Sequence, residues 1–270
     1  MATSADFQTA LKDYWESPAT VSIIDKNLHR LEIDAVSRHL SARDRLADIG
    51  CGNGAATIEY AQRVASCVGF ERSSHMRAQA EDAARRAGAN NLTFEPADIL
   101  SLTGRDGQFD VVVSQRMLIN LASWEEQMQG LLNIHRLLRP GGKAILIENT
   151  NQSFSAMNRM RADVGLEPVP QHWHNRFFDH DDLIEFFKGK FQLLEHNDFG
   201  LYYFLTRVYT QMFAKFEGYG IKAKADAIFQ ESDRAARIAH ERFGNQIRIG
   251  NYSAFGPIQV FVLRREGKDL

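Results

Sequence analysis

The sequence predicts an α/β fold, a doubly wound and mostly parallel sheet with a helical cap inserted late in the chain. Short apolar segments alternate with helical patterns between residues 45 and 147, which is typical of a parallel sheet covered by helices. Phe109–Ser114 is almost continuously apolar, as expected of a strand buried on both faces. Leu46–Gly54, L-A-D-I-G-C-G-N-G, predicts a strand that runs into a glycine loop, where a backbone can approach a nucleotide-like ligand closely.

The composition is that of an ordinary globular protein. The 270 residues are 44% hydrophobic and carry a formal net charge of −2. This charge gives no electrostatic footprint for nucleic acid or an anionic membrane, so we expect neither as a partner and favour a small-molecule substrate. Cys51 and Cys67 suggest no disulfide framework, and no apolar run reaches the ~20 residues of a membrane span. The N-terminus also lacks a signal-peptide pattern, so we expect a cytoplasmic protein.

Residues 1–40 predict two helices ahead of the first strand. Apolar residues at four-residue spacing place the end of the first helix near Trp15, and a second helix is expected from about Ser22 to Leu40. Two interpretations of Tyr14 and Trp15 stay open, packing against the core or contact with a bound substrate. We treat residues 1–40 as an N-terminal helical lid.

Residues 41–150 carry the predicted cofactor-binding core. Its strands are expected at Arg45–Ile49, Ala65–Phe70, Leu92–Glu95, Phe109–Ser114 and Ala144–Ile147. Polar residues follow these strands, and because the carboxyl ends of parallel strands meet at one edge, we expect them to converge there. They are Asp48, Glu71, Asp98, Gln115 and Glu148. Glu71 lies about 20 residues beyond the glycine loop, where a carboxylate can accept ribose hydroxyls. Asp98 has a second interpretation as a helix N-cap or turn residue.

Five segments occur in a characteristic order and spacing over residues 44–148. They are D-I-G-C-G-N-G at 48–54, Glu71, A-D at 97–98, F-D-V-V-V-S at 109–114 and L-L-R-P-G-G-K at 137–143. In these segments the chain resembles the class I, Rossmann-like S-adenosylmethionine-dependent methyltransferases. Its G-x-G-x-G pattern differs from the G-x-G-x-x-G of dinucleotide dehydrogenases. The segments Q-R-M-L-I-N-L, H-W-H-N and L-Y-Y-F-L-T-R are similar to bacterial methyltransferases of small molecules.

The resemblance implies a seven-stranded sheet whose last strand is antiparallel. The strand over residues 191–197 and the final strand within 258–270 complete that sheet. The implied cofactor is S-adenosyl-L-methionine, with S-adenosyl-L-homocysteine as its product, and no metal is expected.

The resemblance also assigns ten cofactor contacts by position. The methionine portion meets Asp48 and the backbone of Gly50, Cys51 and Gly52; the ribose meets Glu71; the adenine meets Met76, Asp98 and Ile99; the methyl region meets Gln115 and Leu118. Family members often have a histidine where this chain has Asn120, so the role of Asn120 stays open.

Residues 151–257 predict a cap and substrate region around the strand at 191–197. A loop carries His172, Trp173 and His174, and an insertion of roughly 55 residues between the last two strands is rich in aromatics, longer than an ordinary connection. These aromatics form either the cap's own core or the wall of an apolar pocket. We expect substrate contacts from Tyr14, Trp15, Arg116, Asn120, Trp173 and Tyr202. The H-W-H segment has no Cys, Asp or Glu at zinc-ligand spacing, so we do not predict a metal site there.

The predicted reaction is transfer of a methyl group from S-adenosylmethionine to an O, N or S atom of a small metabolite. A base is needed only if the acceptor must lose a proton, and His174 is the first candidate, followed by His172 and Tyr203. The alternatives are methylation of protein or RNA, and a non-catalytic cofactor-binding subunit. A nicotinamide dehydrogenase is the weakest rival. The sequence leaves the acceptor, the base and the oligomeric state open.

Overall fold

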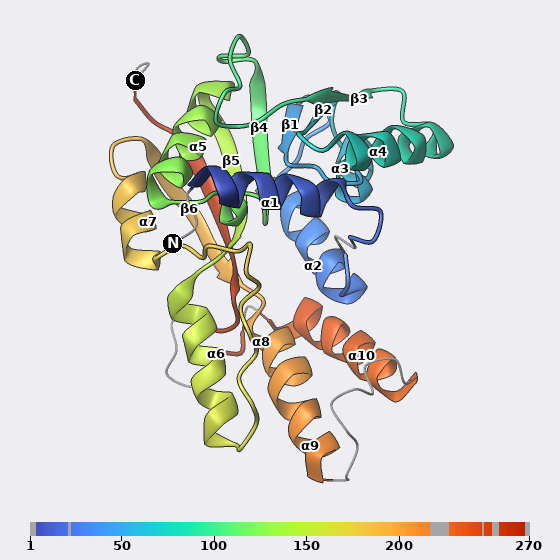
Figure 1. Cartoon of the computed structure of the whole chain (residues 1–270), viewed down its shortest axis with the longest axis vertical. Coiled ribbons are helices and arrows are strands. Elements are labelled where there is room, and N and C mark those ends of the chain that lie inside the picture. Colours follow the sequence, from blue (N-terminus) through green and yellow to red (C-terminus); the bar gives the residue numbers. More distant parts are fainter. Residues whose placement is uncertain (1–3, 21–22, 217–226, 245, 250–253, 268–270) are drawn as a thin grey trace.

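The computed structural model describes residues 4–20, 23–216, 227–244, 246–249 and 254–267 (Figure 1). Within these ranges one seven-stranded sheet has the order β3-β2-β1-β4-β5-β7-β6, and β7 runs antiparallel to both of its neighbours. The strands are β1 Arg45–Ile49, β2 Ser66–Glu71, β3 Leu92–Pro96, β4 Phe109–Gln115, β5 Leu138–Asn149, β6 Phe191–Asp198 and β7 Ile258–Arg265. The expected fold class and antiparallel last strand are confirmed.

Helices cover both faces of this sheet. They are α1 Ser4–Glu16, α2 Lys26–Ser37, α3 Ala55–Ala61, α4 Ser74–Ala87, η1 Leu118–Asn120, α5 Trp124–Leu137, α6 Asn151–Asp163, α7 His180–Phe187, α8 Gly200–Tyr203, the π-helical turn η2 Phe204–Tyr209, α9 Thr210–Phe216 and α10 Ala227–Phe243. Successive side chains of a strand point to opposite faces, so Val111 and Val113 of β4 enter the core beneath α2 and α3. Val112 enters the core beneath α5 and α7.

Local capping explains where several helices begin and end. The Ser73 hydroxyl accepts a hydrogen bond from the Met76 N–H at 3.1 Å, so α4 begins after Ser73, and it ends at Gly88 in the left-handed conformation (φ 67°). The Asp179 carboxylate accepts from the N–H groups of Asp181 and Asp182 and so begins α7.

Two predicted boundaries differ from the structure. Strand β5 begins at Leu138 and not at Ala144, because Leu138 pairs with Phe109 and a register shift takes up the R-P-G-G segment. Helix α2 begins at Lys26 after an Asp25 cap, and the expected start at Ser22 lies outside the described residues. The sequence of the insertion also predicts an alanine- and charge-rich helix over residues 222–242 and includes the aromatic Tyr219. Tyr219 and the first residues of that helix lie outside the described residues as well.

Four of these helices, α1, α6, α9 and α10, lie toward the carboxyl ends of the parallel strands (Figure 1). Figure 1 shows α1 (dark blue) lying across the sheet, while α6, α9 and α10 extend away from it on one side. None of the helices in the described ranges combines the length and the apolar character needed to cross a membrane.

Candidate active site

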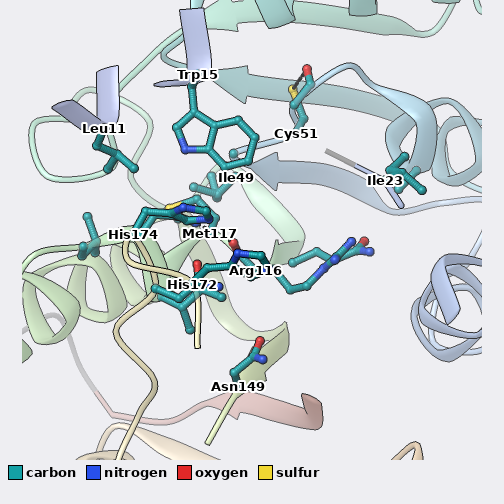
Figure 2. A pocket seen from close by; sticks show the side chains of 18 of the residues that line it. Leu11, Trp15, Ile23, Ile49, Cys51, Arg116, Met117, Asn149, His172 and His174 are labelled. Atoms are coloured by element: carbon teal, nitrogen blue, oxygen red, sulfur yellow. Dashed lines mark hydrogen bonds between the residues drawn. The ribbon is translucent and has the colours of Figure 1, made fainter. Parts of the chain in front are cut away.

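A cavity of about 470 Å³ opens where the parallel strands end. This volume lies within the usual range of small-molecule sites. One half of its wall comes from the residues that follow β1 to β4, which we call the strand-end half. The other half comes from α1, α2, α6, the loop over residues 165–177, η2 and the start of β7, and we call it the cap half. Figure 2 labels Ile49 and Cys51 of the strand-end half, and Trp15, His172 and His174 of the cap half.

The glycine loop gives the strand-end half its backbone. The N–H groups of Gly50 and Cys51 donate to the Phe70 carbonyl at 2.8 and 3.1 Å, which holds the loop against β2. Gly50 (φ 68°) and Gly52 (φ 54°) both adopt the left-handed conformation that favours glycine. A Cβ on Gly50 would lie 2.2 Å from Met117 Cγ, whereas a Cβ on Gly52 would meet nothing within 4 Å. The absence of a side chain at Gly50 therefore lets Met117 pack against the loop, and the absence of one at Gly52 leaves open space for a ligand.

Three carboxyl groups lie beside this loop. Glu71 accepts from the Gly52 N–H at 2.9 Å and from the Ser73 N–H at 2.7 Å, and burial raises the pKa of its carboxyl. Asp48 accepts from the Thr57 hydroxyl at 2.7 Å, and burial raises its pKa to about 6. Asp98 is partly exposed and forms an ion pair with Arg72 at 3.4 Å. The side chains that would contact a polar ligand are therefore held in place by the fold itself.

Eight of the ten predicted cofactor residues line the cavity. They are Asp48, Gly50, Cys51, Gly52, Glu71, Asp98, Ile99 and Gln115. Met76 and Leu118 are not among the residues that line it. Met76 is 2% exposed on the buried side of α4. Leu118 is fully buried in η1 and packs over Gly130, so its side chain points into the sheet core.

Four of the six predicted substrate residues also line the cavity, namely Tyr14, Trp15, Arg116 and Asn120. Trp173 does not. It is 57% exposed, and its ring meets the edges of Phe7 and Tyr14 on the outside of the lid. Tyr202 is fully buried, and its hydroxyl donates to Asp25 at 2.8 Å, so it anchors α2 and does not reach the cavity.

The three predicted base candidates, His172, His174 and Tyr203, all line the cavity. The His174 ring stacks against Tyr14 at 4.7 Å and against His172 at 5.6 Å, joining α1 to the 165–177 loop. Burial lowers the pKa of His174 to about 4, so its imidazole is neutral near pH 7. Burial raises the pKa of the Tyr203 hydroxyl far above its usual value, which keeps it protonated. Among the residues that the structure describes, no three His, Cys, Asp or Glu side chains are grouped as metal ligands.

A buried carboxylate holds the segment that connects β4 to η1. Glu148 accepts from the Ser114 hydroxyl at 2.7 Å and from the N–H groups of Met117 and Leu118 at 3.2 and 3.1 Å. Burial raises the pKa of this carboxyl to about 7. Glu148 does not line the cavity, so its part is to fix the backbone beneath it.

Sequence reasoning missed several polar residues of the cap half. Arg207 reaches the cavity from η2 and donates to Asp25 at 2.6 Å. His29 also lines the cavity, and the buried Glu32 stands one helical turn after it on α2. In the sequence, His29 and Glu32 are marked only by their three-residue spacing on a predicted helix, and such a spacing is common on any helix. A π-helical turn such as η2 is often found at functional sites, but the sequence pattern does not reveal it.

The comparisons with known proteins agree with this geometry. Residues 46–142 match the family model described as a methyltransferase domain. This segment, which runs from β1 into β5, is similar to a methyltransferase domain. The similarity agrees with the sequence resemblance to S-adenosylmethionine-dependent methyltransferases over the same part of the chain.

Two curated relatives show how far the sequence similarity extends. The 27-O-demethylrifamycin SV methyltransferase of Amycolatopsis mediterranei is 37% identical over 109 residues, which cover 40% of this chain and 39% of that protein. An uncharacterised methyltransferase of Schizosaccharomyces pombe is 26% identical over 149 residues, covering 52% of this chain and 49% of that protein. The chain thus matches half or less of the length of these relatives.

Solved structures share the fold over almost the whole chain. The magnesium protoporphyrin IX methyltransferase of Synechocystis PCC 6803, which holds S-adenosylmethionine, aligns with a TM-score of 0.58 at 15% identity, covering 98% of this chain and 100% of that one. The [4+2]-cyclase SpnF aligns with a TM-score of 0.58 at 21% identity, covering 97% of this chain and 92% of that one. A protein described as a [4+2]-cyclase, and not as a methyltransferase, therefore has a similar fold.

Proposed function

We propose that this chain transfers the methyl group of S-adenosylmethionine to an O, N or S atom of a small, largely apolar metabolite. The observation that carries the proposal is one cavity whose wall is shared between the glycine loop and a cap of different composition. Such an arrangement allows two ligands to meet away from bulk water, and positioning them is the main task of a methyltransferase.

The strand-end half fits the proposed cofactor. The open space above Gly52 admits a ligand at the backbone, and the carboxylates of Glu71 and Asp98 face the same cavity as hydrogen-bond acceptors. When bound, S-adenosylmethionine supplies a sulfonium methyl that is already activated for transfer. The chain's own residues then have to bind, align and exclude water.

The cap half fits an apolar acceptor. Its wall includes the side chains of Phe154, Val169, Pro170, Phe177 and Ile258. The basic groups Arg116 and Arg207 are each paired with a carboxylate, so they add no net positive charge for a nucleic acid. These features favour a small molecule over methylation of protein or RNA.

Two other functions remain distinct alternatives. A fold can carry a different reaction, as the cyclase described above illustrates, and a subunit can bind the cofactor without turning it over. Both predict cofactor binding without methyl transfer, so a transfer assay separates them from our proposal.

The test is label transfer from methyl-labelled S-adenosylmethionine to a fractionated cell extract. Label is counted separately in small molecules, protein and RNA, with Gly52→Val as the control variant because its side chain would fill the ligand space. We expect wild-type label in the small-molecule pool and none with Gly52→Val. Label in protein or RNA would contradict the substrate class. Binding of S-adenosylhomocysteine without any transfer would favour the non-catalytic alternative.

A further inference from the structure

The arginine that follows β4 is held at one edge of its guanidinium and open at the other. The side chain of Arg116 is 32% exposed, and Figure 2 labels it among the residues that line the cavity. Its Nε atom is buried and lies 3.3 Å from Oε1 of Glu32, a carboxylate that is itself fully buried. Within the described part of the chain, by contrast, Nη1 and Nη2 are neither buried nor hydrogen-bonded. We call Nη1 and Nη2 the open edge of Arg116.

Contacts behind Arg116 fix the position of its guanidinium. Its partner Glu32 also accepts a hydrogen bond from the Gln115 side-chain amide at 2.7 Å, and the Tyr60 hydroxyl donates to Gln115 Oε1 at 3.0 Å. Neither the carboxylate nor the amide can turn without losing a bond. A buried charge is stable only when it is well paired, so this group is a built feature of the cavity wall.

The backbone of Arg116 is fixed as well, in an uncommon conformation. Arg116 adopts φ 53°, in the left-handed region, which is strained for a residue with a side chain. Its N–H donates to the Ile147 carbonyl at 2.8 Å, and its carbonyl accepts from the Asn120 side-chain amide at 2.8 Å. Strain that the surrounding structure maintains beside a cavity is characteristic of ligand-binding sites.

The carboxylates that line the cap half already have partners. Asp25, just before α2, accepts from the Tyr202 hydroxyl at 2.8 Å and from Arg207 at 2.6 Å. Glu16, at the end of α1, accepts from the Ser74 N–H at 2.7 Å. The described part of the cap half thus offers the open edge no unpaired carboxylate, so an anionic acceptor for its N–H groups has to come with a ligand.

A carboxylate is the group that matches the open edge. A guanidinium holds its N–H donors in one plane, and a carboxylate can accept two of them in parallel through charge-assisted hydrogen bonds. Because Glu32 balances the charge of Arg116, the pair does not attract a polyanion such as RNA, but a single carboxylate still gains both bonds. The cap half is also lined by Phe154, Val169 and Phe177, which suit an apolar remainder of the ligand.

We propose that the methyl acceptor is an apolar carboxylic acid and that Arg116 binds its carboxylate through Nη1 and Nη2. The inference rests on the proposed function and narrows its substrate class from a largely apolar metabolite to one that carries a carboxylate. Arg116 is then a specificity-determining residue that orients the acceptor and takes no proton from it. Its loss should weaken acceptor binding and leave cofactor binding unchanged.

The first test asks which small molecules accept the methyl label. The small-molecule pool of a cell extract is passed over a strong anion exchanger and separated into three fractions. They are the flow-through, the molecules released by formic acid, which protonates carboxylates, and those that only high salt releases, such as phosphates and sulfates. Each fraction is incubated with wild type and methyl-labelled S-adenosylmethionine. We expect the acid-released fraction to become labelled.

The other outcomes of this test separate the inference from the proposed function. Label only in the flow-through would overturn the carboxylate and leave the proposed function in place. Label only in the salt-released fraction would also overturn it, in favour of a different anion. If no small-molecule fraction is labelled, the proposed function and this inference are overturned together.

The second test compares acceptor binding with cofactor binding. Serial dilutions of the acid-released fraction give a relative KM, and calorimetry gives the affinity for S-adenosylhomocysteine. We expect Arg116→Gln to raise the relative KM by about 10- to 100-fold, while kcat and the S-adenosylhomocysteine affinity stay within about threefold. Arg105→Gln is the matched control, because Arg105 pairs with Glu95 at similar exposure and is not among the described residues that line the cavity. It should keep wild-type values.

Arg116→Lys separates recognition from a purely structural role. Lysine keeps a positive charge opposite Glu32 but lacks the planar fork, so this variant carries the test if Arg116→Gln does not fold. We expect Arg116→Lys to fold and to raise the relative KM by about tenfold. An unchanged relative KM in the folded variants would overturn the inference. An equal loss of S-adenosylhomocysteine affinity would also overturn it, because Arg116 would then bind the carboxylate of the cofactor.

Discussion

The two halves of the cavity are built from different kinds of contact. In the strand-end half, Gly50, Gly52 and Glu71 are within 21 positions of one another, and their hydrogen bonds join neighbouring strands. In the cap half, Asp25 meets Arg207 across a sequence separation of 182 residues. The first kind of site follows from where parallel strands end. The second depends on how distant helices pack, which allows the cap to vary while the sheet stays the same.

The largest expected effect tests the rigidity of the strand-end half. Gly50→Ala places a Cβ 2.2 Å from Met117 Cγ at φ 68°, so it combines overpacking with a left-handed backbone. We expect a loss of about 2–5 kcal/mol in the free energy of unfolding, measured by urea denaturation.

Gly88→Ala is the matched control for this substitution. Gly88 has nearly the same φ, 67°, but a Cβ there meets nothing within 4 Å, so it reports the backbone term alone, about 1–2 kcal/mol. Equal losses in the two variants would mean that the loop tolerates the extra atom and that Gly50 is not needed for packing.

A smaller expected effect is on the pH dependence of stability, and it tests the raised pKa of the buried Glu148 carboxyl. Glu148 has a pKa raised to about 7, so between pH 4.5 and 7 the folded chain binds a proton that the unfolded chain has lost. Its contribution is fully present below the unfolded pKa and is lost as pH rises through the folded pKa. We expect the Glu148 carboxyl to lower the free energy of unfolding by about 1–3 kcal/mol between about pH 5 and about pH 8. Burial lowers the pKa of His174 and of His240 to about 4, so these two groups act in the opposite direction, and the Glu148 contribution is measured as the difference between wild type and Glu148→Gln.

Asp48, with a pKa of about 6, acts in the same direction as Glu148. Glu148→Gln should therefore remove only the Glu148 part of the pH dependence. An unchanged slope in Glu148→Gln would show that the Glu148 carboxyl titrates normally.

The smallest expected effect is on the affinity for S-adenosylhomocysteine, which should depend on the strand-end half and not on the cap half. Asp98→Ala removes a partly exposed acceptor, so we expect S-adenosylhomocysteine to bind more weakly by about 1–2 kcal/mol in calorimetry, with little change in stability. Glu71→Ala should weaken binding and also destabilise the fold, because its carboxylate holds the N–H groups of Gly52 and Ser73.

Phe154→Ala is the counterpart in the cap half. It lines the cavity away from the glycine loop, so it should leave the affinity for S-adenosylhomocysteine unchanged. An equal loss of affinity in Asp98→Ala and Phe154→Ala would mean that the cofactor occupies both halves, and the division of the cavity would be wrong.

The sequence by itself determined the sheet, the glycine loop and most of the strand-end half. Alternating strands and helices specify a parallel sheet, and a residue that follows such a strand has its position fixed by the strand. Asp48, Glu71 and Asp98 could be placed at one edge for this reason. Met76 and Leu118 were also expected at the cofactor but do not line the cavity, because the direction of a side chain on a helix depends on how that helix packs.

Only the tertiary structure decided which side chains the cap half presents. Tyr202 was expected at the substrate but is taken up by Asp25, whereas His29 and Glu32 had no motif and became a pair beside Gln115 and Arg116. A helix presents a different side chain every 100°, so its facing residues are set by contacts with elements far away in the chain. Burial then set the basicity of His174, which a local pattern of residues does not encode.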